Sequence, residues 1–215
     1  MGYDYIALGG LVPRRNEEIA EVLDAVREET AGEVRLHLLG VVRPGLYDLM
    51  RDCGVVSFDS SSPVWQAFKD ASDNYYSADE DGHYTAVRIP QANLGLPMRL
   101  VKAGKLDQAN AVQAEREALE ALRAYDANTL GLPALMDVLR VYDDMLGTQR
   151  KTRTPWDRIQ RTLADRPWAS CPCPVCRELG VEVILFRGAN RNRRRGFHNL
   201  WWTQRQLEQW RGDQA

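Results

Sequence analysis

Three closely spaced cysteines and one distant histidine are the side chains in this sequence best suited to chemistry. Cys171, Cys173 and Cys176 alternate with prolines, and His198 follows after twenty-one intervening residues. Thiolates at this spacing can present three sulfurs to one ion, and an imidazole from the next helix completes a tetrahedron. Because such a set leaves no open position for a substrate, the spacing predicts a structural zinc ion (Zn²⁺). The alternative is three unrelated thiols and an unrelated histidine.

Asp59 lies at the end of a predicted strand. It follows a short apolar segment, 55–58, and precedes three serines and Pro63. By sequence alone, the favoured interpretation is that Asp59 caps the turn that follows. His37 lies in an apolar segment, and we expect it to be a satisfied core residue.

Basic residues are concentrated around the cysteines. The formal net charge is −2, but residues 150–195 carry twelve Lys or Arg against four acidic residues, a net +8, which leaves −10 elsewhere. This asymmetry favours a surface that faces a polyanion such as nucleic acid. The candidate phosphate contacts are Arg191, Arg193, Arg194 and Arg195. The alternative is an ordinary solvated loop.

The composition limits the class of protein. The chain has 215 residues, of which 44% are hydrophobic and 27% charged, as is usual for a globular protein with a real core. Its apolar runs are shorter than a membrane span, so we expect no membrane association. The N-terminal residues lack a secretory pattern, so we expect a cytoplasmic protein without disulfides.

The elements that must position these residues alternate in type. Residues 4–10, 34–41 and 55–58 have strand character, and helical patterns occupy the segments from Asn16 to Gly32 and from Pro44 to about Asp52. This order predicts a parallel sheet with crossover helices. Residues 65–88 look like a loop with one hairpin, and residues 97–163 like a helical insertion. Gly9 and Gly10 end the first strand, where they serve either a tight turn or close approach of a flat ligand.

These residues together resemble the tRNA-guanine transglycosylases. That family has a Leu-Gly-Gly strand, a Leu-(Met or Leu)-Gly-Val strand, a Phe-Asp strand and then a Cys-x-Cys-x-x-Cys zinc site closed by His-Asn. The matching segments here are Leu8-Gly9-Gly10, Leu38-Leu39-Gly40-Val41, Phe58-Asp59, and Cys171 to Cys176 with His198-Asn199. The long helical insert and the basic run before His198 look more like the DpdA branch, which places 7-deazaguanine bases into DNA.

The resemblance implies a fold and a reaction. The fold is α/β, the C-terminal portion of a (β/α)₈ TIM-type barrel with a helical insertion and a zinc-binding subdomain, divided at residues 1–64, 65–165 and 166–215. Asp59 would be the nucleophile that attacks the sugar, Gly9 and Gly10 would contact the base, and Cys171, Cys173, Cys176 and His198 would bind zinc. The expected substrates are DNA, with tRNA as the alternative, and a 7-deazaguanine base. Because the match begins near the sixth barrel strand, we expect a complementary N-terminal barrel chain or a homo-oligomer. A non-catalytic, zinc-stabilised nucleic-acid-binding fragment is the other alternative.

Overall fold

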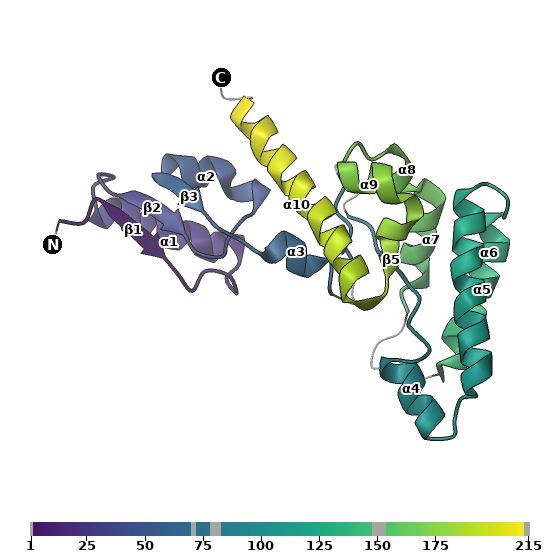
Figure 1. Cartoon of the computed structure of the whole chain (residues 1–215). Coiled ribbons are helices and arrows are strands. Elements are labelled where there is room, and N and C mark those ends of the chain that lie inside the picture. The colour runs from purple at the N-terminus through teal and green to yellow at the C-terminus, as the bar shows by residue number, and fades with distance from the viewer. Residues whose placement is uncertain (1, 70–71, 78–82, 148–153, 213–215) are drawn as a thin grey trace. The chain divides into compact units, whose positions relative to one another are not determined.

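The computed structural model describes residues 2–69, 72–77, 83–147 and 154–212. Over these residues the chain is α/β, with mostly helices and two small parallel sheets. It forms two compact units, one made of residues 1–65 and 203–215 and the other of residues 66–202. Figure 1 shows the elements of each unit. None of the helices in the described ranges combines the length and the hydropathy that crossing a lipid bilayer requires.

The first unit confirms the predicted alternation of strands and helices. Its elements are β1 (Tyr5–Leu8), α1 (Asn16–Glu29), β2 (Arg35–Leu38), a 3₁₀ turn (Pro44–Leu46), α2 (Tyr47–Asp52) and β3 (Val55–Phe58). The strands form one parallel sheet in the order β1-β2-β3. In this register His37 lies opposite Ala7 on one side and Ser57 on the other.

The two faces of this sheet differ in burial. Leu36 and Leu38 of β2 are buried against residues of α1 and α2, which include Ile19 and Met50. Side chains alternate along a strand, so the neighbours of these leucines point to the opposite face. That face is more exposed, and Tyr5 is 45% exposed there. The sheet therefore has one face in a hydrophobic core and one face open.

The second unit is mainly helical, as predicted for residues 97–163. Its elements are β4 (Val87–Arg88), α4 (Gly95–Lys102), α5 (Gln108–Asp126), α6 (Leu132–Met145), α7 (Trp156–Asp165), α8 (Pro167–Ser170), α9 (Pro174–Leu179), a 3₁₀ helix (Gly180–Ile184), β5 (Leu185–Phe186) and α10 (Gly188–Gly212). A short helix, α3 (Ser62–Gln66), ends where this unit begins, and α10 continues into the first unit.

Helices α5 and α6 lie side by side as a helical hairpin (Figure 1). The face of α5 that is buried carries alanines at helical spacing, Ala111, Ala114, Ala118 and Ala121. Small side chains let neighbouring helices approach closely, and Leu135 and Leu139 of α6 belong to the same core. The core also contains all three cysteines of the cluster. Packing of the insertion and formation of the cysteine site are therefore linked.

The segment predicted to contain a hairpin is only partly described. Tyr75 and Tyr84 form an isolated antiparallel bridge, with backbone hydrogen bonds of 3.0 and 2.8 Å in the two directions. The turn of the expected hairpin lies outside the described residues. The bridge fixes the segment around Tyr75, which contacts the cysteine site.

Candidate metal centre and the aspartate at the sheet edge

The four predicted metal ligands come together in the second unit. Cys171, Cys173, Cys176 and His198 are all buried, and their ligand atoms lie within 4.8 Å of one another. Cys171 follows α8, Cys173 caps the N-terminus of α9, Cys176 lies in the first turns of α9, and His198 comes from α10. Sequence spacing alone predicted this group, and the structure confirms that it could hold a metal ion.

The distances fit a tetrahedral ion. Nδ1 of His198 lies 3.7, 3.3 and 3.4 Å from the sulfurs of Cys171, Cys173 and Cys176. In a tetrahedral zinc site, bonds of about 2.3 Å to sulfur and about 2.0 Å to nitrogen separate these atoms by about 3.5 Å. A set of three soft thiolates and one imidazole also suits zinc chemically. The residues present therefore fit the ion that the sequence predicted.

The electrostatics of the cysteine cluster favour a cation. Hydrogen bonds from the thiols of Cys173 and Cys176 lower the pKa of the Cys171 thiol well below its usual range. The same bond to Cys171 raises the pKa of Cys176. The backbone N–H of Cys176 also donates to the sulfur of Cys173 at 3.2 Å. A bound cation would favour the thiolate form of all three cysteines and release their protons.

Two tyrosines hold the histidine in place. Nε2 of His198 lies 2.8 Å from the carbonyl oxygen of Tyr76, so this nitrogen donates and Nδ1 faces the sulfurs as an acceptor. The ring of Tyr75 stacks on the imidazole with a centroid distance of 3.9 Å. Its hydroxyl lies 3.2 Å from the sulfur of Cys176. Burial raises the pKa of Tyr75, so the hydroxyl stays protonated and can donate to sulfur.

Asn199 attaches the same segment to α10. Its Oδ1 accepts from the backbone N–H of Tyr76 at 3.0 Å, and its Nδ2 donates to the carbonyl oxygen of Asn74 at 3.2 Å. His198 and Asn199 together therefore satisfy three backbone groups of residues 74–76. This is a physical reason for an asparagine directly after the histidine ligand.

Asp59 lies at the carboxyl end of β3, as predicted. Its side chain is 65% exposed, and its Oδ1 accepts a 2.6 Å hydrogen bond from the backbone N–H of Gly40. Gly40 has a φ of +77°, and a Cβ there would lie 2.7 Å from Cγ2 of Val12. Glycine is thus required at position 40 by both conformation and space. The two strand ends therefore hold the carboxylate in place while leaving it open to solvent.

Gly9 and Gly10 end β1 at the same edge of the sheet. Gly10 has a φ of +76°, a conformation that other residues adopt at a cost, and a Cβ there would meet no atom within 4 Å. A Cβ at Gly9 would make an ordinary contact of 3.6 Å with Leu39. The backbone turn accounts for glycine at position 10. Contact of either glycine with a base remains a prediction.

The expectation that His37 is a core residue is wrong. Its side chain is 21% exposed on the open face of the sheet, because the register of β2 directs the leucines on either side of it into the core. Its Nδ1 lies 2.6 Å from Oγ of Ser57, and its Nε2 lies 3.8 Å from Oδ1 of Asp59. Ser57 also contacts the hydroxyl of Tyr5 at 2.6 Å. Sequence reasoning missed this group. Side chains alternate along a strand, so the two-residue spacing of Ser57 and Asp59 could have placed both on the same face.

The predicted basic run forms the first turns of α10, and its arginines differ in environment. Arg193 and Arg194 are exposed, whereas Arg191 is half-buried and forms an ion pair with Glu182. Arg195 is not available to a phosphate, because it is fully buried. Its guanidinium donates to the carbonyl oxygens of Ala67, Val183 and Leu185 and to the side chain of Asn192. Burial lowers the pKa of Arg195 to about 9, so the group stays charged at neutral pH.

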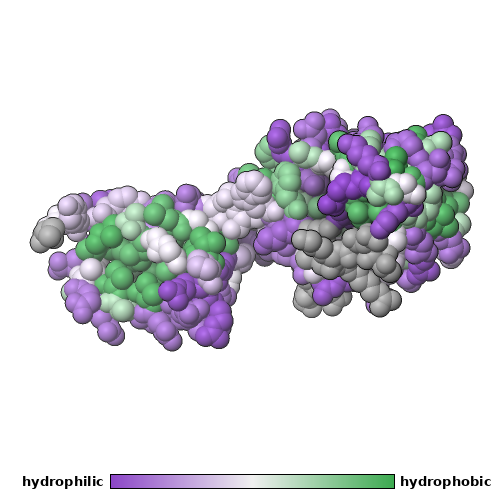
Figure 2. Space-filling model, turned by 90° about the horizontal axis from the view of Figure 1, so that it is seen from below, coloured by the Kyte–Doolittle hydropathy of each residue, from purple (hydrophilic) through white to green (hydrophobic). Residues whose placement is uncertain are grey.

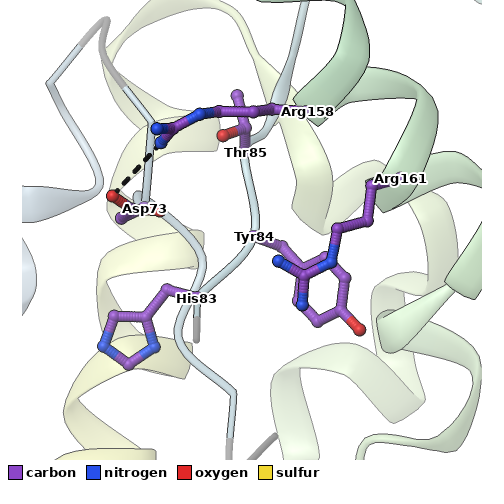
Figure 3. Close-up of a pocket in the computed structure, with 6 residues that line it drawn as sticks. All are labelled: Asp73, His83, Tyr84, Thr85, Arg158 and Arg161. Atoms are coloured by element: carbon purple, nitrogen blue, oxygen red, sulfur yellow. Dashed lines mark hydrogen bonds and ion pairs between the residues drawn. The ribbon is translucent and has the colours of Figure 1, made fainter. Parts of the chain in front are cut away.

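A polar pocket in the second unit was not predicted. Its volume is about 320 Å³, and it is lined by Asp73, His83, Tyr84, Thr85, Arg158 and Arg161 (Figure 3). The guanidinium of Arg161 lies 4.6 Å from the ring centre of Tyr84. Arg158 reaches Asp73 at 3.4 Å. The two arginines are three residues apart on α7 and therefore share a face, which is the sequence signal that could have identified them.

Comparison with known proteins supports the resemblance. No protein-family model matches the chain. The chain is 42% identical over 202 residues to a protein of Salmonella montevideo named DNA-guanine transglycosylase, and the match covers 93% of this chain. It spans 48% of the length of that relative.

Proposed function

We propose that this chain, a relative of the guanine transglycosylases, carries the nucleophile for exchange of guanine in DNA for a 7-deazaguanine base. The observation that carries the proposal is the 42% identity to a DNA-guanine transglycosylase over nearly the whole chain. The position of Asp59 supports it, because this carboxylate is exposed at the carboxyl end of a parallel strand. Active sites of α/β proteins form at such edges.

The proposed reaction has two displacements at one sugar carbon. A carboxylate oxygen of Asp59 attacks C1′, the bond from C1′ to N9 of guanine breaks, and guanine leaves with the electron pair and takes up a proton. The incoming base then attacks C1′ through its corresponding ring nitrogen, the aspartyl ester bond breaks, and the base gives up its proton. A carboxylate suits this role because it stabilises oxocarbenium-like charge before it bonds. Two inversions give overall retention.

The base must leave the helix stack to reach this edge, so the substrate is single-stranded or extruded DNA. Gly9 and Gly10 would contact the flat base, since they follow β1 as Asp59 follows β3. The exposed Arg193 and Arg194 would contact phosphates from the second unit. Zinc at Cys171, Cys173, Cys176 and His198 would be structural, because all four ligands come from the protein and are buried.

The open face of the first sheet supports a further proposal about the fold. We place residues 1–64 in the last three strand-helix units of a (β/α)₈ barrel, residues 65–165 in an insertion and residues 166–215 in the zinc subdomain. The face that carries Tyr5, His37 and Ser57 would then line the barrel interior. Figure 2 shows hydrophobic residues gathered on one side of this unit, and Leu39 is 44% exposed. Such surface favours an interface with further barrel strands, supplied by a complementary chain or by a homo-oligomer.

The test measures exchange of labelled guanine, and incorporation of 7-deazaguanine bases, in DNA and in tRNA. It uses the full chain alone and mixed with a protein that supplies the remaining barrel strands. Asp59→Asn should abolish exchange and preserve salt-dependent DNA binding. The matched control is Asp52→Asn, which removes an exposed carboxylate from α2 of the same unit and should keep activity. DNA binding without exchange in both preparations would contradict the proposal and favour a non-catalytic nucleic-acid-binding protein. Exchange in tRNA alone would make tRNA the substrate in place of DNA.

A further inference from the structure

The open face of the first sheet carries a line of polar side chains that leads toward Asp59. Tyr5 comes from β1, His37 from β2 and Ser57 from β3. The hydroxyl of Tyr5 and Nδ1 of His37 each lie 2.6 Å from Oγ of Ser57. Nε2 of His37 points to Oδ1 of Asp59 at 3.8 Å. Three neighbouring strands thus each contribute one side chain to a single line of polar groups.

A hydrogen bond from His37 to Asp59 would set the direction of the other hydrogen bonds in this line. An ionised carboxylate only accepts, so Nε2 of His37 must carry the proton if it interacts with Asp59. In the neutral imidazole Nδ1 is then an acceptor, and the hydroxyl of Ser57 must donate to it. The remaining lone pairs of Ser57 accept from the hydroxyl of Tyr5. This assignment satisfies both hydrogen bonds of Ser57, and it presents an N–H group to the carboxylate.

We propose that His37 is a positioning residue for the Asp59 nucleophile and that Ser57 holds its imidazole in the Nε2–H tautomer. The proposal rests on the function proposed above. It assigns a role to side chains on the sheet face, distinct from the nucleophile, the glycines and the metal ligands.

The contacts of the Asp59 carboxylate explain how His37 would position it. Oδ1 of Asp59 already accepts the N–H of Gly40 at 2.6 Å. A second N–H from His37 at the same oxygen would hold the carboxylate plane, so that Oδ2 is the oxygen free to attack C1′. In the resulting ester Oδ1 becomes the carbonyl oxygen and keeps both donors. The distance of 3.8 Å between Nε2 of His37 and Oδ1 of Asp59 exceeds hydrogen-bonding distance. A movement of about 1 Å would close it. Catalytic hydrogen bonds are often this long before substrate binds and shorten when it does.

The sheet supports the alignment of this group. Ala7, His37 and Ser57 are partners in the parallel register, so the short side chain of Ala7 lies beside the imidazole. Arg35 lies two residues before His37 on the same face, with its guanidinium 5.6 Å from the ring centre of Tyr5. Its ion pair with Asp4 is exposed. The tyrosine is therefore held at the far end of the line, away from Asp59.

The first test reads the tautomer of His37 in the full chain and does not depend on activity. The sequence has three histidines, so nitrogen-15 spectra of the imidazoles can be assigned with a His37→Gln variant. We expect the Nε2–H tautomer in the native chain, a mixture of tautomers in Ser57→Ala, and a changed Nε2–H proton resonance in Asp59→Asn. An Nδ1–H tautomer in the native chain overturns the proposal.

The second test compares two replacements of His37 in the exchange assay. The amide of glutamine can take the place of Nε2 and donate to Asp59, whereas that of asparagine reaches Ser57 but not the carboxylate. We expect His37→Asn to lower kcat by about tenfold to a hundredfold with little change in KM, and His37→Gln to recover most of that loss. Equal kcat in both variants and the native protein overturns the role of His37. Activity retained in Asp59→Asn would instead overturn the proposed function, and the tautomer result would still stand. Circular dichroism checks that each variant folds.

Discussion

The imidazole of His198 joins the cysteine cluster to the backbone at Tyr76. Its Nε2 donates to the carbonyl oxygen of Tyr76 at 2.8 Å, while its Nδ1 lies 3.3 to 3.7 Å from three sulfurs. The bond on one side of the ring sets which nitrogen is free on the other. One side chain of α10 thus contacts the three cysteines and the backbone of the residue that follows Tyr75 in the Tyr75–Tyr84 bridge.

Removal of one thiol should release the metal. We expect about one zinc ion per native chain, and much less in Cys173→Ser, because structural zinc sites need four ligands. Binding energies of such sites are large, on the order of 10 kcal/mol, so a chelator should also unfold the second unit. Elemental analysis and near-ultraviolet circular dichroism measure these effects. Cys53→Ser is the control, since Cys53 is a buried thiol of the first unit. Equal zinc in native and Cys173→Ser protein would contradict the site.

Asn199→Ala should destabilise the second unit. The variant loses two hydrogen bonds and leaves the backbone N–H of Tyr76 without its acceptor. An unsatisfied buried group costs about 1 to 3 kcal/mol, so the free energy of unfolding should fall by about 2 kcal/mol. Urea denaturation measures this. Asn190→Ala, at an exposed position of the same helix, should change little. A loss below about 0.5 kcal/mol at Asn199 would show that water replaces the side chain.

The arginines of α10 should separate into binding and structural residues. Replacing Arg193 and Arg194 by Ala should weaken DNA binding and reduce the slope of log K against log salt concentration by about 2, since each phosphate contact contributes about 0.9. Stability should be unchanged, because both side chains are exposed. Fluorescence anisotropy at several salt concentrations checks the slope.

Arg195→Met should lower the stability of the chain and leave the salt dependence of DNA binding unchanged. The variant removes the guanidinium that donates to the carbonyl groups of Ala67 and Leu185, so it should lower the unfolding free energy by at least about 2 kcal/mol. The DNA affinity of the protein that remains folded should keep its salt slope. A reduced slope in this variant would mean that Arg195 reaches phosphate after all.

Acid should destabilise the second unit partly through His83. Burial lowers the pKa of His83 below its ordinary value of 6.5, and its Nδ1 accepts from the backbone N–H of Ser77 at 3.2 Å. The neutral form is thus favoured in the folded chain, so the contribution to stability is present above pH 6.5 and is lost as the pH falls below it. His83→Gln keeps an acceptor and does not titrate. Thermal unfolding at pH 8 and pH 5.5 should show a smaller loss of Tm in the variant than in the native chain. An equal loss would assign the acid sensitivity to other groups, such as the metal ligands.

The local order of elements was predictable because periodicity is a property of neighbouring residues. Apolar spacing predicted the helix from Asn16 and the strand at residues 55–58, and both occur. The metal ligands were predictable for a related reason, since three of them lie within six residues and share one turn. The environment of Arg195 was not, because its acceptors come from residues as distant as Ala67. In sequence it looks the same as Arg194.

The sequence by itself therefore determined the kinds of element, the cysteine-histidine ligand set and Asp59 at the end of a strand. The tertiary structure decided which side chains face one another. The register of β2 and β3 brings His37 and Ser57 together across twenty residues, and Nε2 of His37 lies 3.8 Å from Oδ1 of Asp59. Burial and pairing depend on contacts between segments that are distant in sequence, so a local pattern cannot specify them.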